Sequence, residues 1–108
     1  MDELLISGPI EDGECALSDM KLSLNNIIII SEYLTSNSTL HTLNLSDNNI
    51  CNEGVRYIAD ALKVNSTLHT LSLDNNNILS EGARYIAELL KVNSTFHTLY
   101  LFNNKKIS

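Results

Sequence analysis

A 28-residue period constrains this 108-residue chain more strongly than any other feature of its sequence. Residues 37–64 and 65–92 follow one another without a gap and are identical at 20 of 28 positions. Residues 93–108 match the second copy at ten of 16 positions. A unit of this length is too short to enclose a hydrophobic core, so neighbouring units must stack and share one. The repeat therefore predicts a solenoid.

Each unit changes its periodicity partway along. Leu43 and Leu45 alternate with polar residues, which is the pattern of a strand with one buried face. Residues 53–64 then place their apolar side chains at i, i+3, i+4 and i+7, on one stripe of a helix: Val55, Ile58, Ala59 and Leu62. The sequence predicts a strand, a loop, a helix and a turn in every unit, and hence an α/β fold.

Polar residues mark the expected ends of the helices. Asn52 and Ser80 stand where an N-cap side chain would accept a backbone hydrogen bond. Asn65 and Asn93 follow the last apolar residues and are expected to adopt the left-handed conformation that ends many helices.

The spacing of leucine, asparagine and glycine in these units resembles the 28-residue leucine-rich repeat of the ribonuclease-inhibitor type. The first clear unit carries the pattern as Leu40, Leu43, Leu45, Asn48, Ile50, Gly54, Ile58 and Leu62. The second carries it as Leu68, Leu71, Leu73, Asn76, Ile78, Gly82, Ile86 and Leu90. The resemblance implies a leucine-rich repeat solenoid with parallel β-strands on its concave face and α-helices on its convex face.

One leucine-rich repeat domain is expected over residues 1–108. It divides into an acidic leader with a degenerate first repeat (1–36), two full repeats (37–64 and 65–92) and a truncated repeat (93–108). Counting back by one repeat length places Cys15 at the position of Leu43. Met20 then replaces the repeated asparagine, as in a capping unit. An alternative register, with residues 22–24 as the first strand, stays open.

The asparagine after each strand is expected to have a structural role. The backbone turns there, and a buried amide can both donate to and accept from the main-chain groups that the turn leaves unpaired. We expect such a ladder at Asn48, Asn76 and Asn104.

Residues beside the core leucines are expected to point outward and to bind a partner protein. They form three rows: Thr42, Asn44 and Ser46; Thr70, Ser72 and Asp74; Thr98, Tyr100 and Phe102. The resemblance implies a non-catalytic protein-interaction module. The alternative is a structural unit that self-associates as a homo-oligomer through the open C-terminal half-repeat, where Tyr100 and Phe102 would cover the end of the solenoid.

No catalytic or cofactor site is expected. His41, His69 and His97 recur at one position and predict a column about 5 Å apart, which indicates a structural ladder and not a metal site. Cys15 is expected at a buried strand position and Cys51 at a loop position, both as small apolar residues with free thiols. Four Asn-X-Ser/Thr patterns, at Asn37, Asn44, Asn65 and Asn93, are interpreted as turn and strand residues and not as glycosylation sites.

The charge pattern excludes some classes of partner. There are 13 acidic and seven basic residues, and six of the acidic ones precede Lys21, the first base in the chain. This balance disfavours binding to nucleic acid. No apolar run is long enough to cross a membrane, and no secretory signal is recognisable. We therefore expect a cytoplasmic protein that binds neither nucleic acid nor membrane, with an acidic N-terminal end that caps the solenoid.

Overall fold

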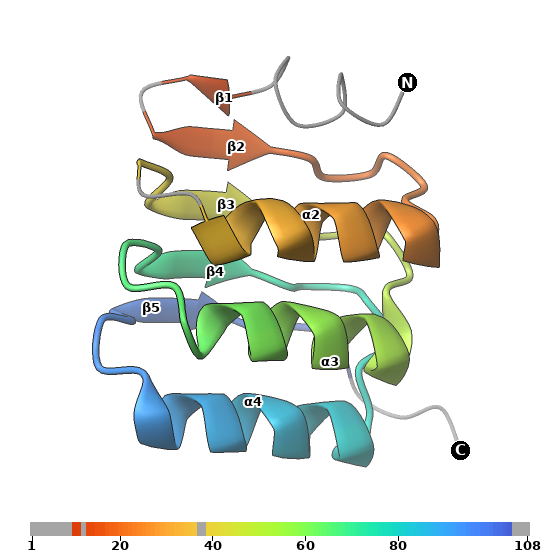
Figure 1. The fold of residues 1–108 in the computed structure, drawn as a ribbon. Coiled ribbons are helices and arrows are strands. Elements are labelled where there is room, and N and C mark those ends of the chain that lie inside the picture. Colours follow the sequence, from red (N-terminus) through yellow and green to blue (C-terminus); the bar gives the residue numbers. More distant parts are fainter. Residues whose placement is uncertain (1–9, 12, 37–38, 105–108) are drawn as a thin grey trace.

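A computed structural model describes residues 10–11, 13–36 and 39–104. The chain alternates short strands with helices of three to four turns (Figure 1). In chain order the elements are β1 (Ile10–Glu11), β2 (Glu14–Ala16), α2 (Leu24–Ser36), β3 (Thr42–Asn44), α3 (Cys51–Leu62), β4 (Thr70–Ser72), α4 (Ser80–Val92) and β5 (Thr98–Tyr100). No helix in these ranges is long and apolar enough to cross a membrane.

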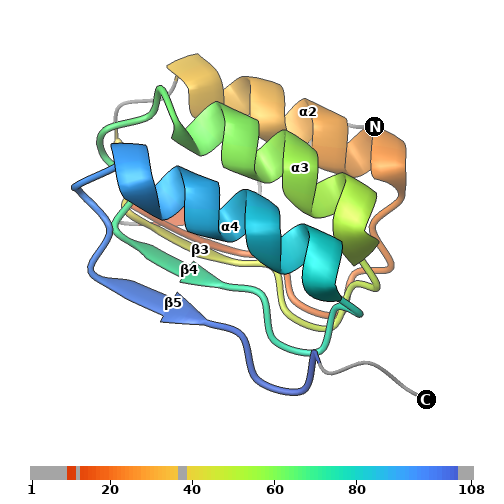
Figure 2. The same ribbon diagram turned by 90° about the horizontal axis from the view of Figure 1, so that it is seen from below.

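The strands form one sheet in the order β1-β2-β3-β4-β5. Strands β2 to β5 are parallel, and each pairs with the next in a register of one repeat length, so that Leu43 lies opposite Leu71 and Leu71 opposite Leu99. Helices α2, α3 and α4 lie on one side of this sheet (Figure 2). The predicted α/β leucine-rich repeat solenoid is confirmed, with the sheet forming its concave face.

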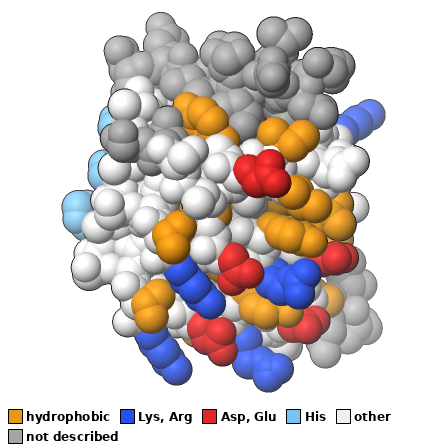
Figure 3. All heavy atoms as spheres, in the orientation of Figure 1, with side chains coloured by type: hydrophobic (Ala, Val, Ile, Leu, Met, Phe, Trp, Pro, Cys, Tyr) orange, Lys and Arg blue, Asp and Glu red, His pale blue; other side chains and the backbone are white. Residues whose placement is uncertain are grey.

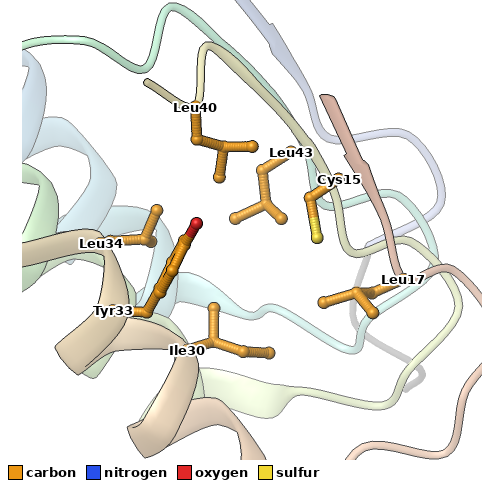
Figure 4. Close-up of a pocket in the computed structure, with 7 residues that line it drawn as sticks. All are labelled: Cys15, Leu17, Ile30, Tyr33, Leu34, Leu40 and Leu43. Carbon is orange, nitrogen blue, oxygen red and sulfur yellow. The ribbon is translucent and has the colours of Figure 1, made fainter. Parts of the chain in front are cut away.

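The hydrophobic core lies between the sheet and the helices. Leu43, Leu45, Leu71 and Leu73 are 0–1% exposed, and Ile58 and Leu62 of α3 meet them from the other side. In the first coil, a small apolar space remains between the sheet and α2 (Figure 4). The core is therefore continuous from coil to coil, as a solenoid requires.

The first coil has the register obtained by counting back one repeat length. Cys15 pairs with Leu43, and the alternative strand at residues 22–24 is wrong because Leu24 begins α2. Strand β1 pairs antiparallel with β2, a hairpin that the repeat pattern did not predict. Met20, at the ladder position, is 48% exposed.

The predicted N-caps of α3 and α4 are wrong. Asn52 is the second residue of α3, and its Oδ1 accepts hydrogen bonds from the Leu79 and Gly82 N–H groups at the start of α4, at 2.8 and 3.0 Å. Ser80 is the first residue of α4 and makes no capping bond with its side chain. Asn52 thus caps the helix of the next coil, a contact that only stacking creates.

A cap that the repeat did not reveal occurs at α2. The Ser23 hydroxyl accepts from the Asn26 N–H at 3.1 Å, and the Asn26 side chain accepts from the Ser23 N–H at 3.0 Å. This is a reciprocal capping arrangement with asparagine at its second position.

The predicted left-handed ends at Asn65 and Asn93 are also wrong. Neither residue is among the described residues with positive φ. Each instead donates its side-chain amide to a carbonyl near the end of the helix one coil earlier: Asn65 to Leu34 O of α2 at 2.8 Å, and Asn93 to Leu62 O of α3 at 2.7 Å. These asparagines form a second ladder, and Asn37, the equivalent residue of the first coil, lies outside the described residues.

Candidate protein-binding face

The three rows of predicted partner-binding residues lie on the sheet face that the helices leave uncovered. In β3 and β4, partly exposed residues alternate with the buried core leucines, whereas Leu99 of β5 is only partly buried. Within the rows, exposure rises from the first to the third. Ser46 is 9% exposed, whereas Tyr100 is 44% and Phe102 is 70% exposed. The third row therefore offers a partner the largest side-chain surface.

A fourth row, which the sequence analysis missed, extends this face. Glu14 pairs with Thr42 and Ala16 with Asn44, so both side chains continue the outer rows onto β2. Both are exposed, and Cys15 between them is buried. Counting back one repeat length, which placed Cys15 at the position of Leu43, also places Glu14 at the position of Thr42 and Ala16 at that of Asn44. We define the concave face as these four rows and the turns that follow them.

Left-handed turns border the concave face where the strands end. Asp19, Asp47, Asn75 and Asn103 have φ between 53° and 62° and recur once in every coil. Asp and Asn tolerate this conformation better than most residues because their short polar side chains bond to the local backbone. The turns thus place two carboxylates, of Asp19 and Asp47, at the rim.

Charge is divided between the two sides of the solenoid. Four of the five described lysines and arginines lie on α3 and α4 or at their ends: Arg56, Lys63, Arg84 and Lys91. Figure 3 shows them interspersed with acidic side chains on the helix side. The strands and their turns carry Glu14, Asp19, Asp47 and Asp74 with a single base, Lys21, among the residues that the structure describes. The concave face is therefore acidic.

The repeated asparagines after the strands lie inside the solenoid and hold successive coils together. Asn48 is 3% and Asn76 is 0% exposed. The amide group of Asn76 donates to Leu45 O at 2.9 Å, while its oxygen accepts from the N–H groups of Asn48 and Ile50 at 2.8 and 3.2 Å. Asn48 and Asn104 repeat these bonds one coil away on either side. Asn104, in the last described coil, is only partly buried.

The three histidines form a stacked column. Ring centroids lie 5.1 Å apart between His41 and His69 and 5.2 Å apart between His69 and His97. Figure 3 shows the column along one edge of the molecule. Gly13 occupies the equivalent place in the first coil, where an added Cβ would come within 2.6 Å of the His41 ring.

The geometry of this column does not suit a metal ion. Stacked imidazoles present their in-plane lone pairs side by side, whereas zinc needs donors that converge at about 2.0–2.1 Å. Among the described residues, no group of three or more His, Cys, Asp or Glu side chains is arranged to hold a metal.

The two cysteines differ in reactivity. Cys15 is 3% exposed, and its burial raises the pKa of the thiol to about 11, from an ordinary value of 9.0. Cys51, predicted at a loop position, is exposed and is the first residue of α3. Both thiols are free. A buried thiol of high pKa is not a nucleophile.

We expect a thiol reagent at pH 8 to modify one cysteine per folded chain. Cys51 should react, and Cys15 should react more than about 100-fold more slowly than an exposed thiol, because two pKa units alone reduce its thiolate fraction by that factor. A chromogenic disulfide reagent measures both phases, and Cys51→Ser should abolish the fast one. If both thiols of the native chain reacted with the reagent at the same rate, the burial of Cys15 would be contradicted.

Three of the glycosylation patterns involve asparagines whose side chains already make hydrogen bonds. The Nδ2 atoms of Asn65 and Asn93 donate to helix-end carbonyls, and the Oδ1 atom of Asn44 accepts from the Ser46 N–H at 3.0 Å. A glycan on Asn65 or Asn93 would displace these bonds. Asn37 lies outside the described residues.

The comparisons with known proteins agree with this architecture. A family model described as "Leucine Rich repeat" matches residues 36–59 and 64–87. A search of curated proteins finds no match. A solved structure titled "Leiomodin-1 Actin-Binding Site 2 (ABS2)" superposes with a TM-score of 0.83 at 24% identity over 94% of this chain. The tropomodulin C-terminal domain of Caenorhabditis elegans superposes with a TM-score of 0.78 at 15% identity over 96% of the chain.

These structural likenesses establish the fold and no more, because the identities are only 24% and 15%. The chain spans 60% of the length of the leiomodin structure and 62% of the tropomodulin structure. Together with the two matched repeats, they support a leucine-rich repeat protein.

Proposed function

This leucine-rich repeat chain, we propose, is a non-catalytic protein-interaction module that recognises a partner protein through its concave face. The exposed third row carries this proposal. Phe102 is 70% and Tyr100 is 44% exposed beside two rows of small polar side chains, and exposed aromatic side chains are typical anchors of protein interfaces. The shared register of β3, β4 and β5 further favours repeats of the ribonuclease-inhibitor type.

The rigid scaffold supports recognition without large conformational change. The concave residues are held on strands whose coils are joined by backbone hydrogen bonds and by two asparagine ladders. A preorganised surface loses little conformational entropy on binding.

A bulky side chain at the centre of the concave face should abolish binding. We expect Ser72→Tyr to block a partner, because Ser72 lies between Asn44 and Tyr100 in the middle of the rows. The next coil carries tyrosine at the same position, so the backbone accommodates this change. Ala87→Tyr, on the exposed side of α4, is the matched control. The measurement is a quantitative pull-down from an extract of the native cells.

The proposal is supported if the wild type and Ala87→Tyr both retain a heterologous protein that two other variants lose. These variants are Ser72→Tyr and the double variant Tyr100→Ser with Phe102→Ser. Equal retention by all variants refutes recognition by the concave face. Recovery of copies of this chain alone would instead favour self-association, which stays a prediction.

Actin is a first defined partner to test, because one similar solved structure is titled an actin-binding site. Co-sedimentation with actin filaments, and gel filtration with monomeric actin, would each reveal such binding. The same pair of variants, Ser72→Tyr and Ala87→Tyr, assigns any binding to a face.

A further inference from the structure

Asp74, Tyr100 and Phe102 come together on the concave face where β4 and β5 adjoin. Tyr100 pairs with Ser72, and Asp74 and Phe102 lie two residues beyond them, in the turns that follow β4 and β5. The Asp74 Oδ1 atom accepts a hydrogen bond from the Phe102 N–H at 2.5 Å, which fixes the carboxylate beside this residue. Backbone hydrogen bonds continue past the strands, from the Leu73 N–H to Tyr100 O at 2.8 Å and from the Asn75 N–H to Phe102 O at 2.9 Å, so the two turns stay side by side.

These three residues have complementary properties. Asp74 is partly exposed, and no other described residue donates a hydrogen bond to its carboxylate. Phe102 is 70% and Tyr100 is 44% exposed. A carboxylate pairs with a guanidinium through two parallel hydrogen bonds, and aromatic faces attract the same planar cation. A lysine can satisfy the charge but cannot both stack and form the bidentate pair.

The charge of the rest of the concave face also favours a positively charged guanidinium at this place. Glu14, Asp19 and Asp47 surround the rows, whereas the described arginines lie on the opposite side of the solenoid. An acidic face with all but one of the described bases elsewhere attracts a basic segment and repels an acidic one.

We propose that Asp74, Tyr100 and Phe102 form a subsite for an arginine side chain of the partner protein, which therefore presents a basic segment to the concave face. This inference rests on the proposed function and names the chemistry of its partner. Asp74 binds the guanidinium, and the two rings pack against its planar faces and its aliphatic stem.

The test is a titration of the ¹⁵N-labelled chain, followed by amide chemical shifts, with the peptide acetyl-Gly-Arg-Gly-amide. We expect shifts concentrated at residues 72–76 and 98–104. The same peptide with citrulline, which keeps the shape of arginine without its charge, should bind at least tenfold more weakly. The lysine peptide should be intermediate.

Variants assign the binding to the three residues. Asp74→Asn should weaken the arginine peptide at least fivefold. Tyr100→Leu and Phe102→Leu, which keep apolar bulk but remove the ring, should weaken it about threefold each. Asp47→Asn is the matched control: it removes an equal charge at the rim of the same face and should change the dissociation constant less than twofold. The amide spectrum of each variant verifies its fold.

Two results would overturn the subsite: equal binding of the citrulline and arginine peptides, or equal weakening by Asp74→Asn and Asp47→Asn. Equal binding of the two peptides would indicate that the site binds an apolar group. Equal weakening by the two variants would indicate that the peptide is attracted by the negative charge of the whole face and not by a specific site. If the peptide fails while Ser72→Tyr still abolishes retention of the cellular partner, only the arginine subsite is wrong, and recognition by the concave face stands.

Discussion

Replacing Asn76 with alanine should lower the free energy of unfolding by about 3–5 kcal/mol. This is the largest effect on stability that we expect among the substitutions proposed for this chain. Asn76 is 0% exposed. Its removal leaves the Asn48 and Ile50 N–H groups without their acceptor, while the Leu45 carbonyl keeps only the hydrogen bond from the Asn48 side-chain amide. Each unsatisfied buried group costs about 1–3 kcal/mol, partly offset where water enters.

Urea unfolding followed by circular dichroism measures this loss. Asn25→Ala, on the exposed surface of α2, makes the same chemical change outside the ladder and should alter stability by less than about 0.5 kcal/mol, since alanine favours helix. One unsatisfied buried group costs at least about 1 kcal/mol. If Asn76→Ala lowers the free energy of unfolding by less than that, the hydrogen bonds of the ladder do not stabilise the stacking of the coils.

Asn65→Gly should be strongly destabilising, by about 2–3 kcal/mol. Asn65 is 4% exposed, donates to Leu34 O, and accepts from the Thr67 and Leu68 N–H groups at 3.0 and 2.8 Å. Glycine removes all of these side-chain bonds and adds backbone entropy to the unfolded state. A residue that merely ended a helix in the left-handed conformation would give the opposite result, because glycine prefers that conformation.

Asn75→Gly is the internal comparison for this second prediction. Asn75 is exposed and has a φ of 58°, so glycine there should be neutral or slightly stabilising. Chemical unfolding of both variants measures the two changes side by side. Similar stabilities would mean that the ladder at Asn65 contributes nothing and that the side chain serves only the turn.

Much of the fold could be predicted because the repeat itself carries the information. Stacking identical units forces equal registers, so the repeat period alone placed Leu43, Leu71 and Leu99 opposite one another and put Thr42, Thr70 and Thr98 in one column. The histidine column also follows from the repeat period, which places one histidine at the same position of three successive coils. Its ring spacing of 5.1–5.2 Å is close to the spacing of neighbouring strands.

The errors occurred where a residue's partner lies in another coil. Asn52 was assigned to the start of its own helix, and Asn65 to the end of its own, because capping rules consider only local sequence. In the solenoid, Asn52 caps α4 and Asn65 binds the end of α2. Stacking brings unpaired helix-end groups of one coil beside the next, and a side chain that reaches across satisfies them.

The candidate site shows the same division. The sequence by itself determined which residues lie on the uncovered face of the sheet, because side chains alternate along a strand. Only the tertiary structure decided their exposure and their neighbours: it buried Ser46, exposed Phe102, and brought the Asp74 carboxylate against the Phe102 backbone. Periodicity fixes the direction of a side chain, whereas its exposure and its neighbours depend on how closely the coils pack.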